Sequence, residues 1–205
     1  MNSAQLSRKD RKKEHRRQTL IDAATLLFTK HGYSGTTIDD IVVEADVAKV
    51  TFYSYFKSKE EIALEIKRKG TEEALAYIEG LRAEQLPVDD MIEKFCTDVA
   101  EWTEKNFRLL DVFCEQRFSP LMERESVSAC KPEPMTICID VIIQCGQEMG
   151  VYRNDIDRCR VAHLLDLAIL CEQYHWVRSG RPDGELKKNL QGYFDFALNG
   201  LKLRK

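Results

Sequence analysis

The segment ADVAKVTFYSYFKSKEEI, residues 45–62, decides how the N-terminal third of this sequence is expected to fold. After a bend at residues 45–48, a short helix is expected over about Lys49 to Tyr55. Ser58 then stands where a side chain can cap a further helix that begins at Lys59. The segment therefore predicts two helices joined by a tight connection, the first of them short.

The side chains of this short helix divide into an inward and an outward set. A helix of this length can bury one side only, and Phe52 and Phe56 are spaced to face a core together with Val47. The outward set consists of Lys49, Thr51, Tyr53 and Tyr55. This set is available to solvent or to DNA; alternatively, the two tyrosines close the seam with the next helix.

Two more helices are expected upstream of the bend. Gly32 can adopt the left-handed conformation that ends helices, and it terminates the first of them. Thr36 or Thr37 caps the second, with Asp39 or Asp40 three residues on as a variant of the capping box. Helix, tight bend and short helix is the organisation that offers its second member to the major groove of DNA.

The order of motifs from residue 20 to 66 resembles the DNA-binding domain of the tetracycline-repressor (TetR) family of bacterial transcriptional regulators. The resemblance is carried by AATLLFTKHGYSGTTIDDIVVEADV, residues 23–47, and TFYSYFKSKEEI, residues 51–62. Together the two stretches keep the order of features found in the family. This order is a helix of small and apolar residues, a turn with Gly followed by an aromatic residue, a Thr-Thr cap, the helix-turn-helix and a segment rich in aromatic residues. The rest of the chain agrees in length and helical character only.

Seven residues are expected to contact DNA, and the resemblance implies all of them except Val50. Thr37 is expected to offer its hydroxyl and backbone N–H to a phosphate. Lys59 is expected to contact a phosphate from the start of the fourth helix, whose N-terminus adds partial positive charge on the same side. The residues expected at the groove or the DNA backbone are Lys49, Val50, Thr51, Tyr53 and Tyr55.

Three residues depart from the family's usual pattern. Asp46 replaces the usual Gly in the bend, but Asp tolerates the left-handed conformation at small cost. Ala48 replaces a Ser cap, which typically costs about 1 kcal/mol at a helix start. Val50 adds a β-branched side chain at the groove-facing edge, where it could contact a thymine methyl. We expect an altered operator preference and retained DNA binding.

Charge is distributed unevenly along the chain. The formal net charge is −3, yet residues 1–69 carry 14 Lys/Arg against 10 Asp/Glu, which is +4, and the remainder carries −7. This asymmetry is expected when only one part of a chain approaches a polyanion. Residues 8–17, RKDRKKEHRR, are either an arm that contacts phosphates or the minor groove, or a solvated extension and first helical turn.

The remaining sequence predicts an all-α protein. Apolar residues recur at helical spacing beyond residue 80, and few prolines and glycines are present for the turns of a β-sandwich. We expect about nine helices in total. The predicted domains are an N-terminal arm and three-helix DNA-binding head with a helix-turn-helix at residues 1–58, and a helical effector-binding and dimerisation domain at residues 59–205.

The second domain is expected to dimerise and to bind a small-molecule effector. Residues 161–171, VAHLLDLAILC, are apolar almost all round, which predicts burial on more than one side. The last two helices are therefore expected to pair with a second subunit, although packing within one chain explains Leu186 and Leu190 equally well. The resemblance implies an effector pocket, for which ordinary core is the alternative. Its candidate lining residues are Phe95, Trp102, Phe113, Met122, Ile139, Ile143 and Leu167.

The cysteines and histidines raise an alternative mode of regulation. Cys159 with His163 and Cys171 with His175 are i, i+4 pairs that could each supply two metal ligands, with Glu172 or a partner chain completing the site. Thiol sensing would use Cys130, Cys138 or Cys145. The default is buried inert cysteines, no metal and no cofactor.

The sequence contains few features that are typical of other functional classes. It contains no glycine-rich phosphate loop, no H-E-x-x-H and no nucleophile elbow, so we expect no enzyme. A helical protein-interaction module would leave the basic N-terminal part unexplained. No apolar run approaches the roughly 20 residues needed to cross a bilayer, and the polar, basic N-terminus is unlike a signal peptide. The sequence therefore predicts a cytoplasmic, ligand-responsive transcriptional repressor that binds a pseudo-palindromic operator as a homodimer.

Overall fold

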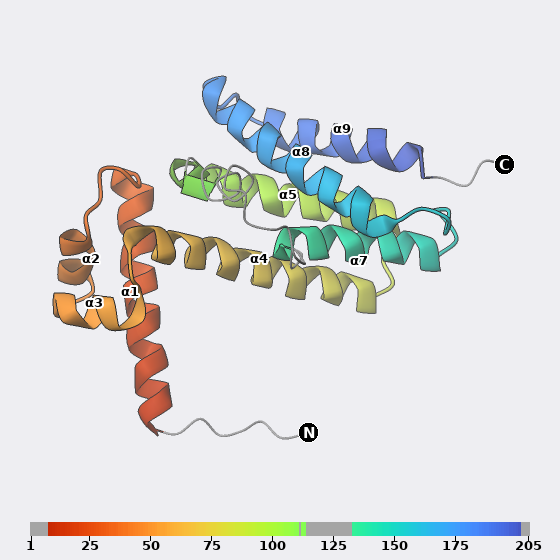
Figure 1. The fold of residues 1–205 in the computed structure, drawn as a ribbon. Coiled ribbons are helices and arrows are strands. Elements are labelled where there is room, and N and C mark those ends of the chain that lie inside the picture. The colour runs from red at the N-terminus through yellow and green to blue at the C-terminus, as the bar shows by residue number, and fades with distance from the viewer. Residues whose placement is uncertain (1–7, 111, 114–132, 202–205) are drawn as a thin grey trace, which may run out of the picture. The chain divides into compact units, whose positions relative to one another are not determined.

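The structure, a computed structural model, describes residues 8–110, 112–113 and 133–201 (Figure 1). Over these residues the chain is all-α, with eight α-helices, one short 3-10 helix and no β-strand. The predicted fold class is confirmed. The elements are α1 (Arg8–His31), α2 (Ile38–Glu44), α3 (Lys49–Tyr55), α4 (Lys59–Ala83), α5 (Val88–Asn106), η1 (Phe107–Leu109), α7 (Pro134–Glu148), α8 (Arg158–Arg178) and α9 (Glu185–Asn199).

The chain forms two compact units, Met1–Lys67 and Arg68–Lys205, and α4 contributes residues to both. The first unit contains α1, α2 and α3 and the start of α4. The second contains the rest of α4 and the helices that follow it. The predicted division into functional domains at residues 58 and 59 remains a prediction.

The first unit folds around apolar side chains contributed by all four of its helices. α1 packs on α2, and α2 packs on α3. Phe52 of α3 is completely buried, and Phe56, which follows α3, lies with its ring centroid 5.9 Å from that of Phe52. The other buried residues are Leu20, Ile21, Ala23, Ala24, Phe28, Ile41, Val42, Ala45, Ile62, Ala63 and Ile66. This core fixes α3 from its inner side.

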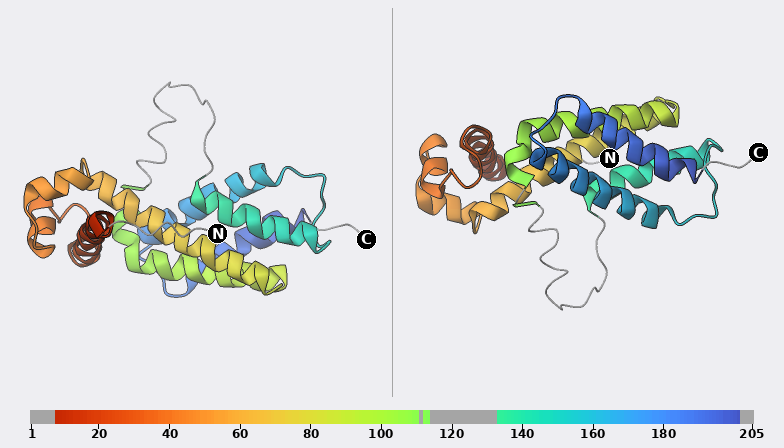
Figure 2. Two further views of the ribbon diagram at one scale, coloured as in Figure 1. Left: turned by 90° about the horizontal axis from the view of Figure 1, so that it is seen from below. Right: turned by 90° about the horizontal axis from the view of Figure 1, so that it is seen from above.

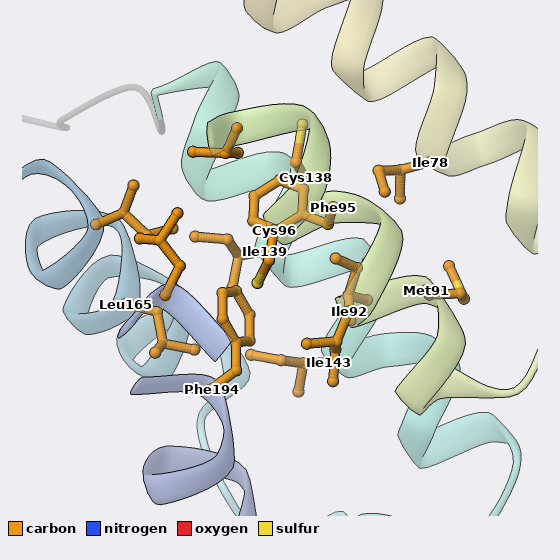
Figure 3. Close-up of a cluster of buried hydrophobic side chains, with 14 of the residues drawn as sticks. Ile78, Met91, Ile92, Phe95, Cys96, Cys138, Ile139, Ile143, Leu165 and Phe194 are labelled. Carbon is orange, nitrogen blue, oxygen red and sulfur yellow. The ribbon is translucent and has the colours of Figure 1, made fainter. Parts of the chain in front are cut away.

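The second unit is a bundle in which α5, α7, α8 and α9 lie side by side (Figure 2). α8 packs on both α7 and α9, and α5 also packs on α7 and α9. At the centre, Phe95 of α5 meets Phe194 of α9 edge to face, with ring centroids 5.7 Å apart (Figure 3). Ile139 of α7 and Leu165 of α8 fill the same core. Large apolar side chains from four helices thus close the bundle.

Two helices of the second unit, α7 and α8, differ in how their apolar residues are used. Pro134 lies in the first turn of α7, where a missing N–H leaves no hydrogen bond unmade. α8 packs on both α7 and α9, but within one chain its residues 161–171 are not buried all round, since Leu164 is 64% exposed. The apolar side chains of α8 extend past the face that α7 and α9 cover. Across the described residues, no helix is both long and apolar enough to span a membrane.

Candidate nucleic-acid interface

The helix-turn-helix begins with a capping box at the start of α2. The Thr37 hydroxyl accepts a hydrogen bond from Asp40 N at 3.1 Å, and the Asp40 carboxylate accepts from both Thr37 N (2.8 Å) and Thr37 Oγ1 (2.7 Å). These bonds lower the pKa of Asp40 below its ordinary value, because the Thr37 hydroxyl and then its backbone N–H stabilise the carboxylate. The capping box predicted from the sequence is confirmed, with Thr37 as the cap.

The bend between α2 and α3 uses Asp46 where glycine was expected. Asp46 has φ 51°, in the left-handed region that Asp tolerates better than most residues. Val47 N donates to Val42 O at 3.0 Å and closes the turn. Ala48 is the N-cap of α3 and makes no side-chain cap. The predicted left-handed conformation of Asp46 and the missing side-chain cap at Ala48 are therefore confirmed, and their effect on DNA binding stays a prediction.

The outer side of α3 carries the exposed side chains of Lys49, Val50, Tyr53 and Ser54. Val50 is 75% exposed and Tyr53 is 51% exposed, while Thr51 and Tyr55 are half-buried. Tyr53 meets the buried Phe52 ring edge to face at a centroid distance of 5.5 Å, which supports it from behind. The short helix thus presents Val50 and Tyr53 outward from a rigid core.

Lys49, the first residue of α3, is paired with Asp39 of α2. Its ammonium lies 2.8 Å from Asp39 Oδ1 and 3.0 Å from Oδ2. The hydrogen bond and charge of Asp39 raise the pKa of Lys49 above its ordinary value. Both side chains remain exposed. No local pattern in the sequence predicts this ion pair, because its two residues are ten positions apart in the chain.

Lys59 is tied to the loop between α1 and α2. Its ammonium donates to Tyr33 O at 2.7 Å and to Thr36 O at 2.8 Å, and it lies 4.1 Å from the centroid of the Tyr33 ring. Two of its three N–H donors are therefore occupied within the chain. Three of the residues expected to contact DNA, Thr37, Lys49 and Lys59, therefore have partners within the chain.

Two further contacts join α4 to α1 and the loop after it. The Tyr33 hydroxyl donates to Glu60 Oε1 at 2.6 Å, and this bond is the main reason that the pKa of Glu60 is lowered. Arg17 Nη2 lies 2.5 Å from Glu65 Oε1, and its guanidinium lies 5.4 Å from the centroid of the Phe56 ring. The basic segment at residues 8–17 lies within α1, so it is helical and not an extended arm.

The candidate effector residues that the structure describes lie in different surroundings within the second unit, and their role in binding an effector stays a prediction. Phe95, Ile139 and Ile143 are buried in the bundle core (Figure 3). Trp102 stacks on Phe113 with ring centroids 6.0 Å apart and packs so closely on α4 that a Cβ at Gly70 would lie 2.5 Å from its Nε1. Leu167 is 36% exposed on the surface of the bundle. Met122 lies outside the described residues.

Buried polar pairs accompany these apolar residues, and sequence patterns missed them. Thr136 Oγ1 donates to Asp166 Oδ2 at 2.9 Å, and Gln173 Nε2 donates to Thr103 Oγ1 at 2.6 Å. All four residues are buried. Pairing meets the hydrogen-bonding needs of groups that are costly to bury alone. A surface hollow of about 510 Å³ between α4 and α5 has acidic walls and includes none of the candidate effector residues.

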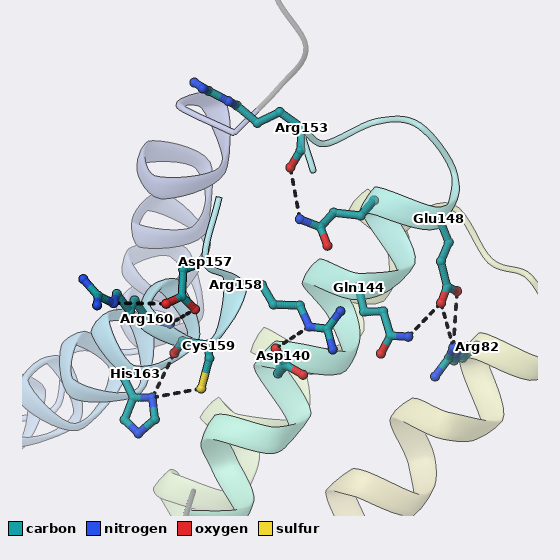
Figure 4. Close-up of polar contacts among 11 residues, drawn as sticks. Arg82, Asp140, Gln144, Glu148, Arg153, Asp157, Arg158, Cys159, Arg160 and His163 are labelled. Atoms are coloured by element: carbon teal, nitrogen blue, oxygen red, sulfur yellow. Dashed lines mark hydrogen bonds and ion pairs between the residues drawn. The ribbon is translucent and has the colours of Figure 1, made fainter. Parts of the chain in front are cut away.

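The cysteines and histidines offer no assembled sensor site in the described part of the chain. Burial raises the pKa of Cys96 and Cys138 to about 12 and also raises that of Cys145. Cys159 Sγ lies 3.8 Å from His163 Nδ1, next to the ion pairs at the start of α8 (Figure 4). No group of three or more His, Cys, Asp or Glu among the described residues could hold a metal ion. Cys130 lies outside those residues.

The capped α2, the tight bend and the outward-facing α3 define the class of the protein as a helix-turn-helix DNA-binding protein. The family model "Bacterial regulatory proteins, tetR family" matches residues 20–66, which include α2 and α3, so this part of the chain is similar to the DNA-binding domain of that family. Its relatives are transcriptional regulators and not enzymes.

Individual relatives extend this comparison beyond the DNA-binding domain. The HTH-type transcriptional regulator YhgD of Bacillus subtilis (strain 168), itself uncharacterized, is 29% identical over 100 residues, which are 49% of this chain and 52% of YhgD. The chain thus spans about half the length of that relative. The transcriptional repressor KstR2 of Rhodococcus jostii (strain RHA1) is 26% identical over 92% of both chains. Thermus thermophilus FadR, a TetR-family repressor solved with lauroyl-CoA, has a TM-score of 0.72 at 23% identity and covers 92% of this chain and 96% of its own.

Proposed function

We propose that this protein is a ligand-responsive transcriptional repressor that binds a pseudo-palindromic operator as a homodimer and is released by a small-molecule effector. The observation that carries the proposal is α3, a short helix held from behind by Phe52 with Val50 and Tyr53 exposed in front. Such a helix can enter a major groove without rearrangement of its core. A cytoplasmic location is part of the proposal because a bacterial operator lies there.

The proposed DNA contacts divide into base and phosphate contacts. Lys49, Thr51, Tyr53 and Tyr55 lie on α3 with Val50, whose methyl groups suit a thymine methyl. Thr37 and Lys59 flank α3 and would position the protein on phosphates. Because the donors of both have partners within the chain, we infer that a phosphate shares or replaces these partners when DNA binds.

The proposed dimer interface consists of exposed apolar side chains on α8 and α9. Leu164, Leu167, Cys171 and Tyr174 are exposed and follow one another at helical spacing along α8. On α9, Phe196 is 86% exposed. Tyr193 links the two helices, since its hydroxyl donates to the buried Glu172 of α8 at 3.2 Å. A face of this kind is expected to be covered, and a second copy related by two-fold symmetry would cover it.

The proposal of repression rests on the relatives, and the proposal of release by an effector rests on the polar groups of the second unit. KstR2 is a repressor, and it matches most of the chain. The buried pairs Thr136–Asp166 and Gln173–Thr103 would supply polar groups to a ligand that entered between the bundle helices. Lauroyl-CoA is a reasonable first compound to test, because the similar FadR structure contains it.

Selection of bound duplexes from a random DNA pool tests this function. The proposal predicts enrichment of an inverted repeat, and an affinity for it that falls steeply as salt rises. Adding a candidate effector should then weaken binding to the selected duplex. Weak, unselective binding with no enriched repeat would contradict the proposal.

A further inference from the structure

The pair formed by Asp39 and Lys49 lies at the proposed DNA-contacting surface. Lys49 is the only basic residue of α3, whose sequence is KVTFYSY. Both oxygens of Asp39 approach its ammonium, at 2.8 and 3.0 Å. In the unbound protein, the one cation of the recognition helix is therefore neutralised by a carboxylate from α2.

The surrounding groups make this pairing specific to Asp39. The neighbouring Asp40 is already occupied by the hydroxyl and backbone N–H of Thr37. Ala48 supplies no acceptor at the start of α3. A lysine in the first turn of a helix is unfavourable beside the positive end of the helix dipole, so a carboxylate there relieves an electrostatic cost. Asp39 thus fixes where the Lys49 side chain points.

We propose that Asp39 is a positioning residue that sets the DNA sequence specificity of this protein, an inference that rests on the proposed function. Nonspecific binding depends on cations that neutralise phosphates, and Asp39 withholds Lys49 from that use. At the operator, Asp39 instead holds the Lys49 ammonium towards a base edge, where the O6 and N7 atoms of guanine are acceptors that a lysine can contact. Asp39 therefore weakens binding to random DNA while supporting binding to the operator.

Asp39→Asn tests this inference, with Glu44→Gln as the matched control. Glu44 is an exposed carboxylate at the other end of α2, so its replacement makes the same change in net charge. Affinities for the selected operator and for random duplex would be measured across a range of salt concentrations. Asp39 is exposed and lies outside the capping box, so the variant should keep its fold, which circular dichroism can verify.

For Asp39→Asn we expect tighter binding to random duplex, with the slope of log affinity against log salt steeper by about 0.9, which corresponds to one more phosphate contact. Operator affinity should not rise by the same factor, so the ratio of operator affinity to random-duplex affinity falls. The preference for one base at one position of each half-site should also be relaxed. Asp39→Glu, which keeps the charge, should restore the original slope. In a Lys49→Gln background, Asp39→Asn should have no effect on base preference.

Two other results would overturn the inference. Equal changes in both affinities, of the size that Glu44→Gln gives, would show that Asp39 acts only through net charge. The same loss of base preference with and without Lys49 would show that Asp39 does not act through Lys49. Wild-type protein that selects no repeat would overturn the proposed function, and this inference with it.

Discussion

At the scale of single residues, Phe52 and Tyr53 show how neighbouring aromatic side chains acquire different roles. Phe52 is completely buried in the core of the first unit, whereas Tyr53 is half exposed and its ring meets the Phe52 ring edge to face. The two-sided nature of a short helix predicted this division from sequence. A replacement at Tyr53 can therefore test DNA contact without disturbing the core.

Tyr53→Ala should weaken operator binding by about 1–3 kcal/mol, the usual effect of losing a base-contacting side chain. The unfolding free energy should change by no more than about 0.5 kcal/mol, because the ring is largely exposed. Fluorescence anisotropy with a labelled operator, together with urea unfolding, measures both quantities. The matched control is Tyr77→Ala on α4, another exposed tyrosine. Unchanged operator affinity in Tyr53→Ala would refute the assignment.

At the scale of elements, local sequence rules predicted several helix boundaries of the DNA-binding unit. Gly32, the Thr37 cap and Lys59 at the start of α4 each depend on interactions within a few residues, so they could be inferred directly. The Asp39–Lys49 pair could not, because its partners lie ten residues apart and meet only through the angle of the bend. The contacts of Lys59 with Tyr33 and Thr36 could not be inferred either, because these residues are far apart in the sequence.

The junction between α4 and the loop after α1 should weaken in acid. The pKa of Glu60 is lowered from its ordinary value of 4.5, mainly by the Tyr33 hydroxyl. Its hydrogen bond therefore stabilises the folded state fully above that value and is lost as the pH falls through the lower folded value. Tyr33→Phe removes the hydroxyl and keeps the ring.

Thermal melts followed by circular dichroism between about pH 7 and about pH 3 can measure this contribution. The melting temperature of the wild type should exceed that of Tyr33→Phe at neutral pH, and the difference should shrink as Glu60 becomes protonated. A difference that stays constant over the whole range would mean that the hydroxyl does not stabilise the ionised Glu60.

At the scale of the whole molecule, the sequence indicated which helices carry the proposed dimer face but not which side of them. Residues 161–171 are apolar almost all round, and only the packing of α7 and α9 shows that Leu164 and Leu167 remain exposed. Effector candidates were less predictable, because core and pocket residues follow the same apolar pattern. Phe95 and Ile139 are completely or almost completely buried in the bundle core.

Phe196→Asp should convert the protein from dimer to monomer. A charge at this exposed aromatic would be desolvated in the dimer without a partner, whereas in a monomer it stays in water. Sedimentation equilibrium measures the state of assembly, and operator affinity should fall together with it. Tyr77→Asp, at an exposed aromatic on α4, should leave assembly unchanged. A Phe196→Asp protein that remains fully dimeric would place the interface elsewhere.

The central claim is that two copies of α3 contact successive major grooves on one face of the operator. The most direct test inserts half a helical turn, about 5 base pairs, between the half-sites of the selected repeat. The account predicts that high-affinity binding is lost, because one half-site then faces away from the dimer. Inserting a full turn of about 10 base pairs restores the facing of the two half-sites, but it does not restore their original spacing of about 34 Å or a multiple of it. Binding that is unaffected by the half-turn insertion would contradict the account.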